Sequence, residues 1–364
     1  MINNILNYKL FFTSKDCIKA IKSKILSAKE SIDIEIYYFT PDNIGSDIIN
    51  LLKQKSSEGV KVRLLLDHVG SFRFDKTSII KDLQKHNIEI RFFNSILPFT
   101  KNRKTFLFLR NHRRSIIIDN EYIFTGSVCL SDQMIHWLDL CILIKDKSLN
   151  DKVRKIFNST WNRVYYPTFR IGRSSNKYLK SKEERDFSYI TQSPLQFERH
   201  IYKEYLKNIK NSKTNITLVA PYFIPDFKLT RQLKQATKKG VVVNIILPIK
   251  SNWLIADIAR NTFIKTFIKH KINIYFIEKM IHSKFAIFDD KSAFIGTMNL
   301  DNLSLKYNYE SGMLIYNQQC INDLQTYSEF LISKGFSFSE KSWSKRNIIL
   351  KISEIIIWPI RKFL

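Results

Sequence analysis

The chain has 364 residues, of which 44% are hydrophobic and 13% aromatic, a composition that excludes a disordered protein and favours two folded domains. Its 59 Lys and Arg residues against 33 Asp and Glu residues give a net charge of +26. This surplus favours anionic partners, either acidic lipid headgroups or nucleic acid, unless it reflects only a lysine-rich composition.

Four scattered cysteines show no metal-ligand spacing, so we expect a reduced, cytoplasmic protein without a zinc site. The first residues lack the basic and apolar regions of a signal peptide. No apolar run reaches the roughly 18 residues of a spanning helix. Neither a signal peptide nor a membrane span is therefore expected.

The first half of the chain predicts strands that alternate with helices. A helix is expected at Cys17–Ala28, and a second helix has its apolar face at Ile44, Ile48, Leu51 and Leu52. The predicted strands are Tyr8–Phe12, Ser31–Phe39, Val60–Leu66 and Ile88–Phe92.

The second half repeats this order. Strands are predicted at Asn215–Ala220 and Val241–Leu247, with a helix between them. The turn Ile224-Pro225-Asp226 matches Thr40-Pro41-Asp42 of the first half. We therefore predict an internal duplication that forms mixed α/β sheets covered by helices on both faces.

A candidate catalytic motif begins at His282. His282, Lys284 and Asp289 form the pattern H-x-K-x(4)-D, followed by a predicted hairpin of Phe285–Phe288 and Ser292–Ile295. Residues two apart on a strand point to the same face, so the imidazole and the ammonium lie together. That pair suits work on an anionic group.

A second copy of the pattern lies in the first half. His112 and Asp119 are seven residues apart, as are His282 and Asp289. Seven residues after each Asp comes a Gly followed by a hydroxyl residue, Ser127 or Thr297. Asp139 follows the first histidine by 27 residues, and Glu310 follows the second by 28.

At these residues the chain resembles the phospholipase D superfamily, and in particular its bacterial cardiolipin synthase-like branch. The resemblance covers roughly residues 21–330. It implies two duplicated phospholipase D-like α/β sandwich domains that are related by a pseudo-twofold axis and meet at the two motifs, in a monomer that is an internal pseudo-dimer. The first copy departs from the family pattern at Arg114, where the family has Lys, and at Cys129, where it usually has Asn.

The resemblance also implies the catalytic roles. One of His112 and His282 attacks phosphorus to form a phosphohistidine, and the other transfers the proton; the family favours His112 as the nucleophile. Lys284 and Arg114 hold the phosphoryl oxygens, and Asn299 donates a further hydrogen bond. No metal ion and no cofactor are implied.

Four acidic residues complete the predicted catalytic set. Glu310 and Asp139 are each expected to accept a hydrogen bond from the far nitrogen of a histidine. Asp119 and Asp289 are expected to hold their turns. The predicted substrate-binding residues are Ser127, Thr297, Lys101, Arg103, Lys104 and Arg110.

The predicted organisation is an N-terminal domain at 1–166, a polar linker at 167–194, a C-terminal domain at 195–345 and an amphipathic segment at 346–364. The basic and aromatic stretch Asn94–Arg110 suits a lipid interface, single-stranded nucleic acid or a plain surface loop. The last segment predicts either an interfacial membrane helix or a terminal core helix.

The leading hypothesis is a phosphatidyltransferase that resembles cardiolipin synthase and acts on anionic phospholipids as a peripheral protein on the cytoplasmic face of the membrane. The alternatives are a phospholipase D that makes phosphatidic acid, a phosphodiesterase of nucleic acid, and a catalytically weak lipid-binding protein. Nucleic acid is the less favoured partner, because two motifs in one chain match the synthase-like pattern.

Overall fold

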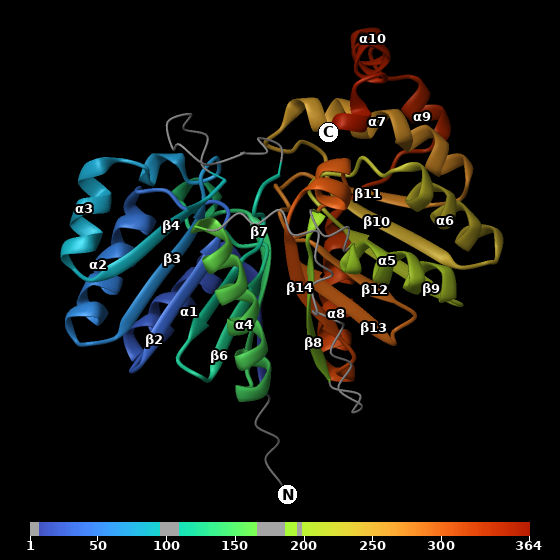
Figure 1. Cartoon of the computed structure of the whole chain (residues 1–364). Helices are drawn as coiled ribbons and strands as arrows, with labels where there is room; N and C mark the ends of the chain where they lie inside the picture. The colour runs from blue at the N-terminus through green and yellow to red at the C-terminus, as the bar shows by residue number, and fades with distance from the viewer. Residues whose placement is uncertain (1–6, 95–108, 166–185, 195–198) are drawn as a thin grey trace, which may run out of the picture.

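The computed structural model describes residues 7–94, 109–165, 186–194 and 199–364, which form two seven-stranded sheets (Figure 1). The strand order in the first sheet is β1-β7-β6-β5-β2-β3-β4. Its strands are β1 (Tyr8–Thr13), β2 (Ser31–Ile36), β3 (Lys61–Asp67), β4 (Ile88–Phe93), β5 (Ser115–Ile118), β6 (Tyr122–Gly126) and β7 (Leu138–Lys145).

The second sheet repeats the first strand for strand, in the order β11-β10-β9-β12-β13-β14-β8. In each sheet three neighbouring strands pair in parallel, and the motif hairpin (β5 with β6, or β12 with β13) is antiparallel. The predicted duplication is thus confirmed. The strands are β8 (Phe187–Gln192), β9 (Asn215–Val219), β10 (Val242–Pro248), β11 (Asn273–Ile277), β12 (Phe285–Phe288), β13 (Ser292–Gly296) and β14 (Glu310–Ile315).

Helices cover the sheets and also fill the space between them. The outer face of the first sheet packs on α1 (Ser14–Ser27), α2 (Asn43–Ser57) and α3 (Thr77–Lys85). The outer face of the second packs on α5 (His200–Asn211), α6 (Phe227–Lys238) and α7 (Leu254–Lys269). A third core joins the inner faces of both sheets with α4 (Lys147–Tyr165) and α8 (Gln318–Lys334), so the two halves form one packed body.

The repeated Pro-Asp turn starts an equivalent helix in each half. The Asp42 side chain accepts a hydrogen bond of 3.1 Å from the Gly45 N–H at the start of α2. The Asp226 side chain accepts one of 2.9 Å from the Leu229 N–H at the start of α6. Capping of free N–H groups by Asp explains why the same local sequence begins a helix twice.

Two of the differences between the predicted and observed boundaries affect the site and the second sheet. β2 ends at Ile36 rather than Phe39, and the ring of Tyr37 instead packs edge-on to the His112 ring at 4.9 Å between centroids. β8 lies inside the segment predicted as a linker, 167–194, and pairs with β14 at the edge of the second sheet. Only Ile190 and Gln192 of β8 are buried, so the strand carries little apolar periodicity for a sequence pattern to reveal.

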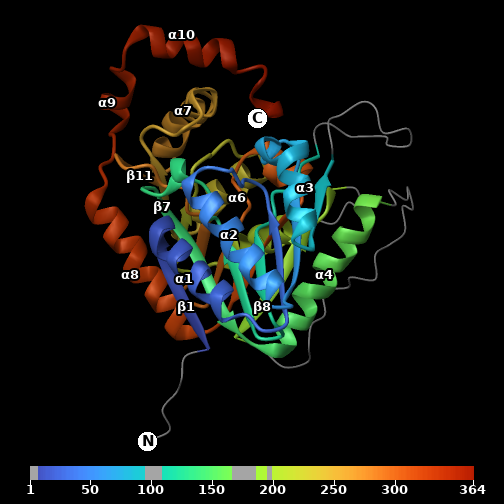
Figure 2. The same cartoon turned by 90° about the vertical axis from the view of Figure 1, so that its left-hand side faces the viewer.

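The chain ends in two short helices outside the second sheet. These are α9 (Glu340–Ser344) and α10 (Ile348–Ile357). Figure 2 shows α10 at the outer edge of the molecule beyond α7, the helix on which it packs. Of the helices that the structure describes, none has both the length and the apolar character to cross a membrane.

Candidate active site

Reciprocal backbone contacts join the two halves beside the motifs. Isolated parallel bridges link Asn111 to Tyr309 and Leu138 to Ile281. In each bridge, the residue before a motif histidine pairs with the residue before an acid of the other half. The His112 N–H accordingly donates to the Tyr309 carbonyl at 2.9 Å, and the His282 N–H to the Leu138 carbonyl at 2.7 Å. The resulting site belongs to both halves.

The first histidine is held by the acid of the second half. His112 Nδ1 lies 2.9 and 3.0 Å from the two carboxylate oxygens of Glu310, which is fully buried. The Thr297 hydroxyl donates to the same carboxylate. Thr297, predicted to bind substrate, therefore lies behind the histidine as a hydrogen-bond partner of its acid.

The second histidine is held in the same way by the first half. His282 Nδ1 lies 3.0 Å from Asp139 Oδ2. The Ser127 hydroxyl donates to Asp139 Oδ1, and the Ser14 hydroxyl lies 3.4 Å from Oδ2. Ser127 thus occupies the place that Thr297 occupies in the other half, which follows from the matched spacing of the two copies.

Two cations lie beside the histidines. Lys284 is 1% exposed, and its Nζ donates one hydrogen bond of 2.7 Å, to the His282 carbonyl. The Arg114 Nη2 lies 3.2 Å from His112 Nε2 and 3.4 Å from the Cys129 sulfur. Within the described residues, the Nε of Arg114 has no hydrogen-bond partner. Both cations keep donors available for an anionic group.

Burial determines the protonation state of the two histidines, His112 and His282. Burial, together with the charges of Arg114 and Lys284, lowers the pKa of His112 to about 4 and that of His282 to about 3, while the carboxylates of Glu310 and Asp139 act in the other direction. Arg114 contacts His112 and Lys284 contacts the His282 carbonyl, so each half provides a cation beside its own histidine. Burial and the charge of Arg114 also lower the pKa of Lys284, to about 7.

The acids remain ionised and therefore define the tautomers. Burial raises the pKa of Glu310 and Asp139, but the hydrogen-bonded histidines and hydroxyls outweigh it, so both pKa values are lowered. An ionised carboxylate only accepts, so each neutral imidazole donates from Nδ1. The Nε2 lone pair of each ring then faces the site.

The two motif aspartates lie at the far ends of their hairpins. Asp119 accepts from the backbone N–H groups of residues 29–31, and Asp289 from those of residues 213–215. Both have φ of 51°, a left-handed conformation that Asp tolerates in turns. These contacts match the expectation that the two residues hold turns.

The other predicted site residues are placed unequally. Asn299 is 5% exposed, and its side-chain oxygen has no partner among the described residues. Arg110 is turned to Asp67, with Nη1 3.4 Å from Oδ1. Lys101, Arg103 and Lys104, with most of the predicted basic loop, lie outside the described residues.

Sequence reasoning missed the residues that support His112. The Asn111 amide donates to the buried Glu35 carboxylate at 2.9 Å, while the Asp67 carboxylate accepts from the Asn111 N–H at 2.8 Å. With Tyr37, these groups hold the segment before β5 that carries the histidine. The one available signal was the aromatic run before Pro41, which resembles the run before Pro225.

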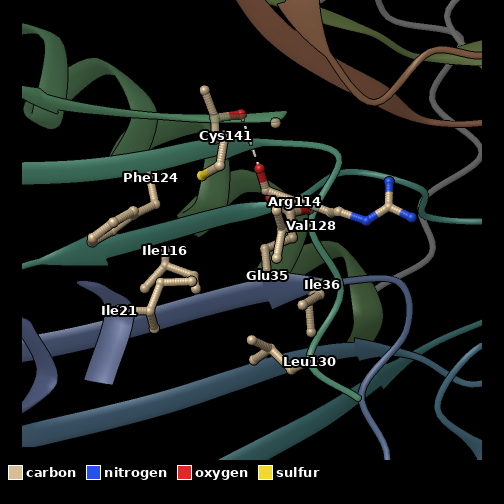
Figure 3. Close-up of a pocket in the computed structure, with 11 residues that line it drawn as sticks. Ile21, Glu35, Ile36, Arg114, Ile116, Phe124, Val128, Leu130 and Cys141 are labelled. Carbon is tan, nitrogen blue, oxygen red and sulfur yellow. Dashed lines mark hydrogen bonds between the residues drawn. The ribbon is translucent and has the colours of Figure 1, made fainter. Parts of the chain in front are cut away.

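An apolar pocket lies behind Arg114 in the first half (Figure 3). Its lining includes Ile36, Ile116, Val128 and Leu130. Figure 3 shows the Arg114 guanidinium pointing away from these side chains. The guanidinium therefore lies at the interface between the two halves, beside His112.

The paired motifs and the duplicated sheets are shared with known proteins. The family model described as "Cardiolipin synthase, PLD-like domain" matches residues 21–161 and 205–331. This chain belongs to that family. The match covers both copies of the fold and both motifs, so the predicted superfamily, fold and enzyme class are confirmed: the chain is a phosphatidyltransferase-type enzyme of the phospholipase D superfamily.

Relatives of this cardiolipin synthase-family chain span nearly all of it. A cardiolipin synthase of Clostridium perfringens is 28% identical over 96% of this chain and 75% of that protein. Cardiolipin synthase 1 of Staphylococcus aureus is 28% identical over 94% of this chain and 71% of that protein. The crystal structure of phosphatidylserine synthase from Haemophilus influenzae matches with a TM-score of 0.79 at 14% identity, over 99% of this chain and 93% of that one, which shows a common fold.

Proposed function

We propose that this cardiolipin synthase-family chain moves a phosphatidyl group from one anionic glycerophospholipid to a hydroxyl of another, through a phosphohistidine. The observation that supports this best is the crosswise pairing of His112 with Glu310 and of His282 with Asp139. It presents two Nε2 atoms and two cations to one phosphorus. Phosphoryl transfer needs little more than such positioning and charge.

In the first step, His112 Nε2 attacks phosphorus. The new N–P bond forms as the P–O bond to the leaving alcohol breaks, and His282 gives its proton to that oxygen. A bound phosphodiester carries a negative charge, which raises the pKa of the buried His282 and allows it to enter the step protonated. The Arg114 contact to His112 Nε2 moves to a phosphoryl oxygen when substrate binds.

In the second step, neutral His282 removes a proton from the incoming hydroxyl. The hydroxyl oxygen attacks phosphorus, the N–P bond breaks, and His112 regains its lone pair. Lys284 and Arg114 stabilise the negative charge that develops on the phosphoryl oxygens in both steps, and the Asn299 amide provides a further polar contact. Asp139 and Glu310 orient the rings and stabilise the imidazolium that forms.

We further propose that the protein acts as a monomer, with residues 1–166 and 195–345 as the halves of one internal pseudo-dimer. The core that the two sheets share supports this, because it packs the two halves against each other within one chain. An anionic lipid substrate and a net charge of +26 support peripheral association with the cytoplasmic face of a membrane.

The test uses purified protein and phosphatidylglycerol vesicles, with products separated by mass. Cardiolipin and glycerol together support the transferase, whereas phosphatidic acid alone shows that water is the acceptor. A parallel reaction with single-stranded DNA tests the nuclease alternative. His112→Ala and His282→Ala should each lower turnover to the background rate while circular dichroism stays unchanged. Near wild-type turnover in either variant would rule out the two-histidine mechanism.

A further inference from the structure

Exposed apolar side chains are concentrated at the C-terminus. Of the 20 large hydrophobic residues that are exposed in the described chain, nine lie between residues 348 and 363. A patch of this density on a protein surface marks a contact with another apolar body. The nine are Ile348, Ile349, Leu350, Ile352, Ile355, Ile356, Trp358, Ile360 and Phe363.

The orientation of α10 is the reverse of a core-packed helix. Ile348, Ile352, Ile355 and Ile356 recur at helical spacing on one face, and that face is exposed. The polar residues 351, 353 and 354 are half-buried on the side toward the protein. In water this arrangement exposes the apolar face, so the helix is suited to an apolar medium.

Specific contacts hold the helix in this orientation. The guanidinium of Arg346 pairs with Glu354 at 2.6 Å and lies 3.5 Å over the ring of Trp343, which is buried. Beyond the helix, Arg361 lies 4.8 Å over the ring of Phe263 on α7. Ile357 turns inward to the small core formed by Ile224 and α7. The outward face is therefore a fixed part of the fold.

The charges beside this face suit an anionic lipid surface. Residues 346–364 contain four cationic side chains and one acidic side chain, Glu354, which is already paired with Arg346. Lys362 is exposed at the end of the apolar face and lies 5.1 Å over the ring of Phe363, while Arg361 lies 3.0 Å over the ring of Trp358. Aromatic and basic residues beside an aliphatic face are typical of helices that lie in the headgroup region of a membrane.

The same segment is attached to the candidate active site. The carbonyl of Leu364 accepts a hydrogen bond of 2.8 Å from the Asn302 N–H, and the Asn302 side chain lies 3.4 Å from the Arg361 carbonyl. Asn302 follows Asn299 by three residues in the loop of the second motif. The exposed apolar face and the site are thus parts of one continuous structure.

We propose that α10 and the C-terminal turn, residues 348–364, form a docking surface that inserts into an anionic phospholipid monolayer. Inserted in this way, the segment holds the loop of Asn299 and Asn302 at the lipid surface, where a phospholipid headgroup enters the site. The binding step stands independently, and only its consequence for turnover rests on the proposed function.

The test compares two double variants of the full chain. Ile355→Gln/Ile356→Gln alters the docking surface, and Leu26→Gln/Val242→Gln alters equally apolar, exposed residues elsewhere as a matched control. Binding is measured by co-sedimentation with vesicles of phosphatidylglycerol and phosphatidylcholine, and with phosphatidylcholine alone. We expect the first variant to bind anionic vesicles at least about tenfold more weakly, since each isoleucine gives up its transfer into lipid. The control should bind like the wild type, and neutral vesicles should bind less than anionic ones.

Unchanged vesicle binding in Ile355→Gln/Ile356→Gln would overturn the proposal. Light scattering provides a second test. A dimeric wild type and a monomeric Ile355→Gln/Ile356→Gln variant that bind vesicles equally would show that a second copy covers the face, and would also overturn the proposal. Turnover of a short-chain, water-soluble phosphatidylglycerol separates the two proposals. The docking surface is supported if both variants turn over the soluble lipid at the same rate and only Ile355→Gln/Ile356→Gln loses activity on vesicles. If Ile355→Gln/Ile356→Gln binds vesicles more weakly but the wild type turns over no lipid, the docking surface stands and the proposed function is refuted.

Discussion

His282 and Asp139 come from opposite halves of the chain and share a hydrogen bond of 3.0 Å. The same relation, reversed, joins His112 of the first half to Glu310 of the second. Each half therefore supplies one imidazole and the carboxylate that orients the imidazole of the other half. Neither half alone contains a complete histidine–acid pair, which explains why the two copies must remain packed together.

Asp139→Asn and Glu310→Gln should each lower kcat by about 10² or more, because the amide no longer stabilises the imidazolium during proton transfer. The carboxylate raises the pKa of its histidine, so its loss should move the optimum of the pH–rate profile to lower pH. Steady-state rates between pH 5 and 9 measure both effects. Asp47→Asn, an exposed surface residue, is the control. An unshifted optimum would show that the acids serve the fold alone.

Arg114→Lys should leave turnover unchanged or raise it, since it gives the first motif the cation that Lys284 provides in the second. Adding Cys129→Asn should raise kcat/KM further, by up to about tenfold, because an amide donates hydrogen bonds that a thiol forms weakly. Arg114 and Cys129 are in contact, so the effects should be non-additive in a double-mutant cycle. A severe loss in Arg114→Lys would mean that the reaction needs the planar guanidinium.

The pKa of Lys284, lowered by burial and by Arg114 to about 7, predicts how activity depends on pH. The ammonium is present below that pH and lost above it, so kcat/KM should fall as pH rises through about 7. In Lys284→Arg the side chain stays charged, and the alkaline fall should move to higher pH. A fall at the same pH in wild type and variant would assign it to another group.

Asp289→Ala should lower the free energy of unfolding by about 1–3 kcal/mol, because it removes a half-buried, charged acceptor from the N–H groups of residues 213–215. Urea unfolding at pH 7 measures the loss, with the exposed Asp151→Ala as control. Turnover of the folded variant should stay within about twofold of the wild type. Burial raises the pKa of Asp289, but the backbone donors outweigh it and lower the pKa. Its contribution to stability is therefore present above the ordinary carboxyl pKa of about 3.9 and lost as pH falls through the lowered value.

Local patterns in the sequence were sufficient for much of the fold. Hairpin and helix periodicity predicted β12, β13 and the helix that follows the second Pro-Asp turn, because each depends on neighbours within a few residues. The repeat of spacing around His112 and His282 predicted two equivalent motifs of one kind. β8 was missed because an edge strand with few buried residues is defined by its pairing with a distant strand.

Tertiary structure alone decided how the copies combine. Which acid holds which histidine depends on contacts between residues 143 and 198 positions apart, and no local pattern encodes such a pairing. The sequence likewise could not determine which way the apolar face of α10 points, since an amphipathic helix has the same periodicity whether that face packs on the core or faces outward. The sequence by itself determined the chemistry that each strand carries, because side-chain direction follows from local backbone geometry. The tertiary structure determined the partners, because burial against a particular surface depends on the whole chain.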